Sequence, residues 1–239
     1  YHIYVAKKLH QFDHAGYKCL VFSVNSYKTL NELGAETRDY RQRAVQLAPV
    51  LKQLLLGVAF IHSAKLTHNN INWSNVMVSG ANANAFRINI INFSLSQPIR
   101  PDSTDGVVLS RVPKHTLGFS PPEAYADIDY DLRKQDTWSV MATAVAFYKG
   151  KISGNTRVRD GVREPLSQKK YEESMRRLHE KHRDTRDVYP LHDSIYALFQ
   201  RIVPSSRKLF TINNAIRPIP EDFVQQHLKA ITSTRPYVA

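Results

Sequence analysis

A chain of 239 residues with 42% hydrophobic and 23% charged residues is long enough to bury a full core, and this composition excludes a disordered or fibrous protein. Its formal net charge of +12 favours anionic partners without identifying one. The single cysteine, Cys19, excludes an internal disulfide and a cysteine-based zinc site, and its apolar surroundings predict a buried thiol. The longest apolar runs are shorter than the roughly 20 residues that cross a bilayer, so no membrane span is expected.

The first part of the chain predicts a hairpin followed by helices. Residues 1–24 have the alternation of two strands, and residues 13–16 have the composition of the turn between them. A short helix is expected at 29–33. A long apolar helix is expected at 41–62, where Pro49 should introduce a kink or a break.

The middle of the chain predicts a second hairpin, with strands at 75–78 and 86–91 and a turn at 79–84. Residues 92–123 have the composition of a loop. Apolar periodicity then predicts helices at 131–148, 168–182, 191–203, 211–216 and 222–231, with a linker at 149–167. The helix at 168–182 places Tyr171, Met175 and Leu178 on one face.

The polar loop after residue 67 resembles the catalytic loop of the protein kinase superfamily, whose pattern is His-Arg-Asp-Leu-x-x-x-Asn. His68 matches the family His, Ile71 its Leu and Asn75 its metal-binding Asn. Asn69 replaces the Arg, and Asn70 replaces the Asp that acts as the catalytic base. A carboxamide does not accept a proton from a substrate hydroxyl near neutral pH, so the resemblance implies a loop without its base.

Two further positions that are charged in the kinase family hold uncharged residues in this chain. Asn72 replaces a Lys that follows the base in many kinases, and Asn92 replaces the magnesium-binding Asp in an Asn92-Phe93-Ser94 motif. An amide oxygen binds a hard cation more weakly than a carboxylate does. The resemblance therefore implies no catalytic residues, no metal site and no cofactor, with only weak residual nucleotide binding at Asn75.

The ending of the presumed activation segment is the most specific match. Residues 116–123 fit the family pattern Thr-x-Gly-Tyr-x-x-Pro-Glu, with Thr116 and Glu123 kept. In the family this Glu pairs with a distant Arg. Because residues 204–207 resemble the segment that supplies it, a structural ion pair between Glu123 and Arg207 is expected.

The resemblance also implies structural roles for four other residues. Asp136 matches an Asp that binds the backbone of the catalytic loop, and Trp138 matches its packing partner. His68 is expected to pack beneath Phe93 rather than to bind a metal, because it has no second ligand at metal spacing.

The resemblance implies an α+β, protein-kinase-like bilobal fold, mostly the helical large lobe with only part of the β-rich small lobe. Residues 1–25 would form the partial small lobe and hinge, and residues 26–239 the large lobe. Lys7 or Lys8 could instead be the phosphate-binding Lys. Only eight residues separate Lys8 from the next strand, however, and none is Glu, so this registration is disfavoured. Whether a glycine-rich loop is truly absent or lies outside the chain stays open.

Together these substitutions predict a pseudokinase, not an enzyme, that acts as a scaffold, a decoy or an allosteric partner. Its candidate interaction face consists of basic residues on the helix at 168–182: Lys169, Lys170, Arg176, Arg177 and Lys181. Expected partners are a kinase or another acidic protein, or an anionic membrane surface; nucleic acid is disfavoured. The basic, glycine-loop-lacking chain is also similar to the secreted kinases of apicomplexan parasites that lack this loop. The compartment stays open.

The alternative is a kinase-fold nucleotide-binding enzyme with unusual transferase chemistry. It would need an acidic metal ligand that faces the cleft. Asp127, Asp129 and Asp131 are the nearest acids in sequence, but they follow the Pro-Pro-Glu motif and are expected to face outward.

Overall fold

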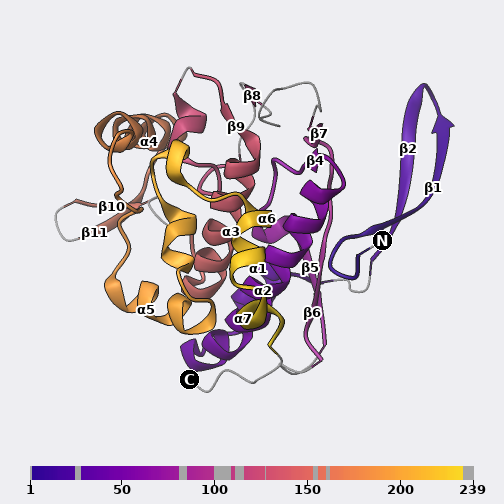
Figure 1. Ribbon diagram of the computed structural model, residues 1–239, viewed down its shortest axis with the longest axis horizontal. Coiled ribbons are helices and arrows are strands. Elements are labelled where there is room, and N and C mark those ends of the chain that lie inside the picture. The colour runs from indigo at the N-terminus through magenta and orange to yellow at the C-terminus, as the bar shows by residue number, and fades with distance from the viewer. Residues whose placement is uncertain are drawn as a thin grey trace.

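In the computed structural model of the protein, a helical body is accompanied by small antiparallel sheets (Figure 1). This architecture confirms the α+β class predicted from the sequence. The structure describes residues 2–24, 28–80, 85–99, 109–110, 116–126, 128–152, 156–159 and 162–233. Asn25 of the expected hinge, residues 81–84 of the expected turn, and Asp127 lie outside these ranges.

The N-terminal hairpin stands away from the helical body at the right of Figure 1. Strand β1 (Lys7–His14) pairs antiparallel with β2 (Tyr17–Ser23). The turn between them has positive φ angles at Ala15 (48°) and Gly16 (80°), as a tight two-residue hairpin turn requires. The expectation of a buried thiol is wrong, because Cys19 is only partly buried on this two-stranded ribbon.

The two N-terminal helices follow the sequence pattern. Strand β3 (Lys28–Thr29) leads into α1 (Leu30–Glu36), whose first turn is closed by reciprocal hydrogen bonds between Thr29 and Glu32. Helix α2 (Tyr40–Ser63) starts at the cap Asp39 and continues through Pro49 without ending. By length and composition alone α2 could cross a membrane, contrary to expectation, but 61% of its apolar window is buried inside the protein, as in a core helix.

A three-stranded antiparallel sheet lies beside α2, in the order β3-β5-β6. Its longer strands are β5 (Val76–Ser79) and β6 (Arg87–Ile90), which form the predicted second hairpin. Strand β4 (Leu66–Thr67) pairs with β7 (Gln97–Pro98), and β8 (Leu109–Ser110) pairs with β9 (Tyr130–Asp131). The β4–β7 pairing lies directly before the loop at residues 68–75 that carries the candidate site, and β5 follows that loop.

Helix α3 (Leu132–Lys149) runs through the centre and packs against α2. Nearly all its side chains are buried, as expected for a helix surrounded by others. The remaining helices are α4 (Gln168–His182), α5 (Asp193–Ile202), α6 (Pro220–Gln226) and α7 (Leu228–Thr232), with 3-10 turns at Trp73–Asn75, Pro122–Tyr125, Ser206–Phe210 and Asn214–Ile216. The expected linker at 149–167 instead contains a hairpin of β10 (Thr156–Arg159) and β11 (Val162–Pro165).

Candidate functional site

The loop at residues 68–75 is held by one carboxylate from the centre of the protein. Asp136, in the first turns of α3, accepts the backbone N–H of His68 at 2.7 Å and that of Asn69 at 2.8 Å. Its carboxylate also lies 2.9 Å from Nε2 of His62 at the end of α2. Asp136 is completely buried, so these bonds replace the water that its charge would otherwise require.

His62 is a buried, protonated histidine that sequence reasoning missed. Its Nδ1 lies 3.0 Å from the carboxylate of Glu221 on α6, so its ring bridges two acids. Burial by itself lowers the pKa of His62, but hydrogen bonds to Asp136 and Glu221 and their negative charges raise it to about 9. Because these acids are distant in sequence, no local pattern could have indicated this cluster.

His68 is neutral, in contrast to His62. Burial lowers its pKa, although the charge of Asp136 opposes this shift. Its Nε2 lies 3.0 Å from the carbonyl oxygen of Ile91, which can only accept, so Nε2 carries the proton. Its Nδ1 accepts the backbone N–H of Asn70 at 3.2 Å. The ring meets Phe93 edge-on with centroids 4.8 Å apart, so the packing contact expected from the resemblance is present.

Three of the four positions where the family carries charge belong to one network of carboxamides and the Thr116 hydroxyl, whereas the fourth, Asn69, bonds to the carbonyl of Leu95. Oδ1 of Asn70 accepts from the Thr116 hydroxyl at 2.8 Å and from Nδ2 of Asn72 at 3.0 Å. Nδ2 of Asn75 donates to the backbone carbonyl of Asn70 at 2.9 Å, and Nδ2 of Asn92 donates to Oδ1 of Asn75 at 3.2 Å. Neutral hydrogen bonds therefore connect these side chains, in addition to the bonds from Asp136 that hold the start of the loop.

This donor set does not fit a tightly held magnesium ion. The amide oxygen of Asn75 is already bonded to the N–H of Asn92, so a cation would have to displace that hydrogen bond. Among the residues that the structure describes, no group of three or more His, Cys, Asp or Glu side chains is arranged for a metal. Asp131 is not such a ligand either, since it caps α3 and pairs with Arg133 at 2.9 Å.

The ion pair of Glu123 is made with Arg217, and the prediction of Arg207 is wrong. Arg217 Nη1 lies 2.6 Å from Oε1 of Glu123, and both side chains are completely buried. Arg207 instead lies over the ring of Tyr196, 4.8 Å from its centroid, and its side chain is 46% exposed. The 3-10 turn Ser206–Phe210 leaves the side chain of Arg207 exposed. Arg217, which follows the later 3-10 turn Asn214–Ile216, is the residue that reaches Glu123.

Trp138 lies at the centre of an aromatic cluster. Its ring lies 4.3 Å from that of Phe210 and 5.5 Å from that of Tyr189, by centroid distance. The guanidinium of Arg217 lies over the Trp138 ring at 4.8 Å. The buried ion pair and the aromatic cluster therefore support each other.

The basic residues of the candidate interaction face lie on α4, and all of them are exposed. They do not form a single patch. Lys170, Arg177 and Lys181 follow one line along the helix at i, i+7 and i+11, whereas Arg176 points to another side and donates to the carbonyl of Tyr125 at 3.2 Å. Lys169 lies on the same side as Arg176. Sequence reasoning grouped residues that the helix separates.

The fold and the site define a kinase-like domain, because a loop of this spacing is held by a buried Asp from the central helix and followed by an antiparallel hairpin. A family model described as "protein kinase domain" matches residues 2–236, and the chain belongs to this family. It has a partial bilobal, kinase-like α+β fold. The division into lobes at residue 25 stays a prediction.

Relatives match only part of the chain. A probable serine/threonine-protein kinase of Dictyostelium discoideum is 28% identical over 101 residues, which are 42% of this chain and 11% of the relative. The sperm motility kinase Tcr mutant form of Mus musculus is 28% identical over 108 residues, 45% of this chain and 20% of the relative. The serine/threonine-protein kinase SAPK2 of Oryza sativa is 28% identical over 102 residues, 41% of this chain and 27% of the relative.

These findings correct the prediction that the chain is not an enzyme. The family model and the relatives, all named as kinases, point to a kinase enzyme. That prediction depended on the carboxamides at Asn70, Asn72 and Asn92. These residues decide which proton acceptors and metal ligands the loop offers, but they do not by themselves decide whether the whole protein is an enzyme. The similarity to apicomplexan secreted kinases stays a prediction, since these relatives come from an amoeba, a mouse and rice.

Proposed function

We propose that this kinase-family domain binds an acidic partner protein through α4 and acts as a scaffold or allosteric partner. The proposal is carried by one observation: α4 divides into a buried side and a basic side. Tyr171, Met175 and His179 are buried against the protein. The opposite line of Lys170, Arg177 and Lys181 faces solvent.

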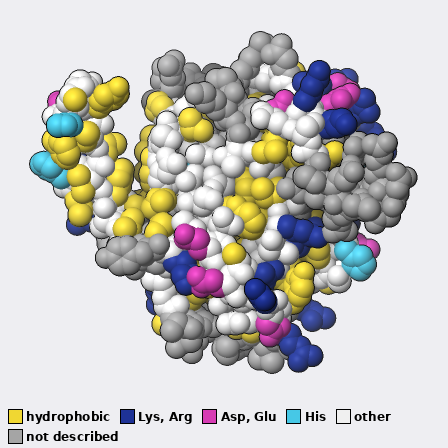
Figure 2. Space-filling view, turned by 180° about the vertical axis from the view of Figure 1, so that it is seen from behind, with side chains coloured by type: hydrophobic (Ala, Val, Ile, Leu, Met, Phe, Trp, Pro, Cys, Tyr) yellow, Lys and Arg dark blue, Asp and Glu magenta, His cyan; other side chains and the backbone are white. Residues whose placement is uncertain are grey.

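The basic line on α4 is largely uncompensated by acidic neighbours, which supports binding of an acidic partner. Arg177 pairs with Glu173 at 2.5 Å, while no ion pair holds Lys170 or Lys181 among the described residues. Figure 2 shows Lys and Arg side chains gathered at the upper right, where α4 lies, with acidic side chains beside them. The positive charge of Lys170 and Lys181, which no ion pair compensates among the described residues, favours an acidic protein surface.

The test measures binding to an acidic probe, a ten-residue glutamate peptide, by biolayer interferometry at two salt concentrations. The variant carries Lys170→Glu, Arg177→Glu and Lys181→Glu. Its matched control carries Arg201→Glu, Lys208→Glu and Lys229→Glu, which change the net charge equally at exposed positions elsewhere. We expect at least a tenfold loss for the α4 variant, a loss below about twofold for the control, and weaker binding at high salt.

Two outcomes would contradict the proposal. Equal losses in the α4 variant and its control would show that only overall charge matters. Tighter binding to vesicles of phosphatidylserine and phosphatidylcholine than to the peptide would assign this face to an anionic membrane instead.

A second candidate function is nucleotide-dependent phosphotransfer or related transferase chemistry. It is favoured by membership of the protein kinase domain family and by relatives named as serine/threonine kinases. The amide of Asn70 can hold a hydroxyl by a hydrogen bond, as it holds that of Thr116, but another group would have to accept the proton. The test is thermal unfolding with ATP, with and without magnesium or manganese. A metal-dependent rise in Tm supports this candidate, and its absence counts against it.

A further inference from the structure

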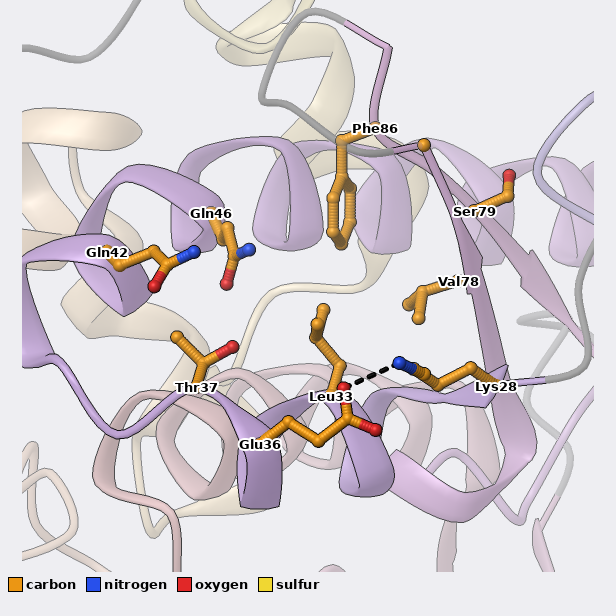
Figure 3. Close-up of a pocket in the computed structure, with 10 residues that line it drawn as sticks. Lys28, Leu33, Glu36, Thr37, Gln42, Gln46, Val78, Ser79 and Phe86 are labelled. Carbon is orange, nitrogen blue, oxygen red and sulfur yellow. Dashed lines mark hydrogen bonds and ion pairs between the residues drawn. The ribbon is translucent and has the colours of Figure 1, made fainter.

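The β1–β2 hairpin stands away from the helical body (Figure 1). Within the body, the β5–β6 hairpin is covered, because Val78 and Phe86 face α1 and α2 across a pocket (Figure 3). Strands β1 and β2, by contrast, pair only with each other among the described strands. A two-stranded hairpin is marginally stable by itself in water, so a surface that packs on this ribbon would stabilise it.

The pairing register divides the ribbon into two faces. Directly opposite residues share a face, and successive pairs alternate between the faces. Phe22 stacks on Phe93 of the body with ring centroids 6.3 Å apart, which makes the face of Phe22 the inner one. Asp13 and Lys18 also belong to this inner face. The outer face consists of three other pairs: His10 opposite Val21, Phe12 opposite Cys19, and His14 opposite Tyr17.

The outer face is apolar, and its side chains are open to solvent. Phe12 is 45% exposed, Tyr17 76% and Val21 39%, while Cys19 is partly buried. The ring of His10 stacks on that of Phe12 with centroids 6.1 Å apart. Figure 2 shows hydrophobic and His side chains gathered on the hairpin, at the left of the view. None of the outer-face residues is Lys, Arg, Asp or Glu, so this face carries no formal charge at pH 7.

Charge indicates what packs on this face. A strongly charged partner would lose hydration against Phe12 and Val21 and would find no opposite charge in the three pairs. The chain has a formal net charge of +12, so two copies repel each other wherever their basic residues meet. The outer face is a surface on which two copies can meet without opposing Lys or Arg side chains. A two-fold contact requires one surface that complements itself, and an uncharged apolar face meets this requirement.

We propose that two copies of this chain associate through the outer faces of their β1–β2 hairpins, in a two-fold dimer with Phe12 and Cys19 at its centre. The outer face presents far fewer side chains than the roughly 20–30 residues that a standard interface uses on each side, so the dimer is weak and dissociates on dilution. Sheets that pack face to face lie roughly 10 Å apart, which brings the two Cys19 side chains within reach of a short bifunctional reagent. This surface shares no residue with α4, so it is independent of the acidic-partner proposal.

The test uses the whole chain and its native cysteine, which is the only one in the sequence. Sedimentation equilibrium is measured from about 1 µM to about 1 mM, the range in which weak complexes form. We expect a reversible monomer–dimer equilibrium. Bismaleimidoethane should link two chains through Cys19 with a yield that rises with concentration. A monomer over the whole range would overturn the proposal, as would a dimer that the reagent does not link.

Two variants of neighbouring residues locate the contact. Phe12→Glu adds a charge to the outer face, whereas Gln11→Glu adds the same charge to the inner face and keeps the acceptor that Nζ of Lys8 contacts at 2.9 Å. A two-fold dimer contains each substitution twice, so we expect Phe12→Glu to weaken it at least tenfold and Gln11→Glu to change it less than about threefold. Equal effects of the two variants would overturn the proposal.

Tyr17→Glu, at the end of the outer face beside the turn, is a second variant for the case that Phe12→Glu disturbs the hairpin. It should also weaken the dimer and lower the yield of linked chains. Unchanged dimerisation in Tyr17→Glu and Phe12→Glu would place the contact elsewhere on the chain and overturn the proposal.

Discussion

Replacing Arg217 with Met should destabilise the protein far more than the same change at Arg207. Arg217 donates to both oxygens of Glu123 and to the carbonyls of Thr211, Ile212 and Lys134. The substitution leaves Glu123, which has no solvent exposure, without a counterion. Breaking a buried pair in this way costs about 3–5 kcal/mol, which is a large share of an ordinary stability of about 5–15 kcal/mol.

Arg207→Met is a matched control, because both guanidinium groups lie 4.8 Å from an aromatic ring centroid. Arg207 is 46% exposed, and its nearest carboxylate, on Asp193, lies 4.0 Å away. A pair of this kind contributes about 0–1 kcal/mol. The two variants therefore remove the same chemical group and similar ring contacts, and they differ in the buried ion pair and in the three backbone carbonyls that Arg217 also binds.

Urea unfolding followed by circular dichroism measures the difference. With a slope of about 3 kcal/mol per molar urea, Arg217→Met should lower the midpoint by about 1–1.7 M, and Arg207→Met by less than about 0.3 M. The added change Glu123→Gln should recover part of the loss, because it removes the unpaired charge. Equal midpoints for the two Arg variants, or a larger loss at Arg207, would refute the reasoning.

Two further predictions concern the loop. The pKa of His62 is raised from 6.5 to about 9 in the folded protein, so its contribution to stability is fully present below about pH 6.5 and is lost as pH rises through 9. The free energy of unfolding, measured from pH 6 to 10, should show this loss, and His62→Gln should not. Asn92→Asp should lower Tm without metal, because a carboxylate would replace the N–H that faces Oδ1 of Asn75, and Mn²⁺ should restore it.

Each of these two predictions can be contradicted by a specific result. If unfolding free energies of the wild type and His62→Gln run parallel over the whole pH range, His62 is not the titrating group. For the metal experiment the control is Asn92→Gly, since Asn92 has a φ of 65° that glycine adopts without strain. If Mn²⁺ raises Tm equally in Asn92→Gly and Asn92→Asp, the added carboxylate does not bind the ion.

The sequence predicted the main helices and hairpins because their signals are local. The helix at 168–182 was predicted with the observed bounds, because its apolar residues follow the helical period. The loop from His68 to Asn75 was recognised from spacing and residue type along a short stretch of chain. Local patterns failed where burial depends on neighbours: Cys19 lies in an apolar run, yet no second layer of the described protein covers it.

Tertiary structure decided the partners of the buried charges. The sequence identified Glu123 as half of an ion pair, but chose Arg207, because a motif carries no information on which way a 3-10 turn directs its side chains. Likewise, nothing near His62 in sequence indicates Asp136 and Glu221, which reach it from two other helices. Nor does helical spacing alone show that Gln53 meets a strand while Gln46 faces a pocket.

The sequence by itself thus determined the main helices, the first two hairpins and the carboxamide chemistry of the loop, since these depend on residue type and short-range spacing, but it missed the β10–β11 hairpin. Only the tertiary structure decided which charges pair and which basic residues share a face. The physical reason is that a buried polar group is stabilised by whatever the folded chain brings within hydrogen-bond distance, and that distance is unrelated to separation in sequence.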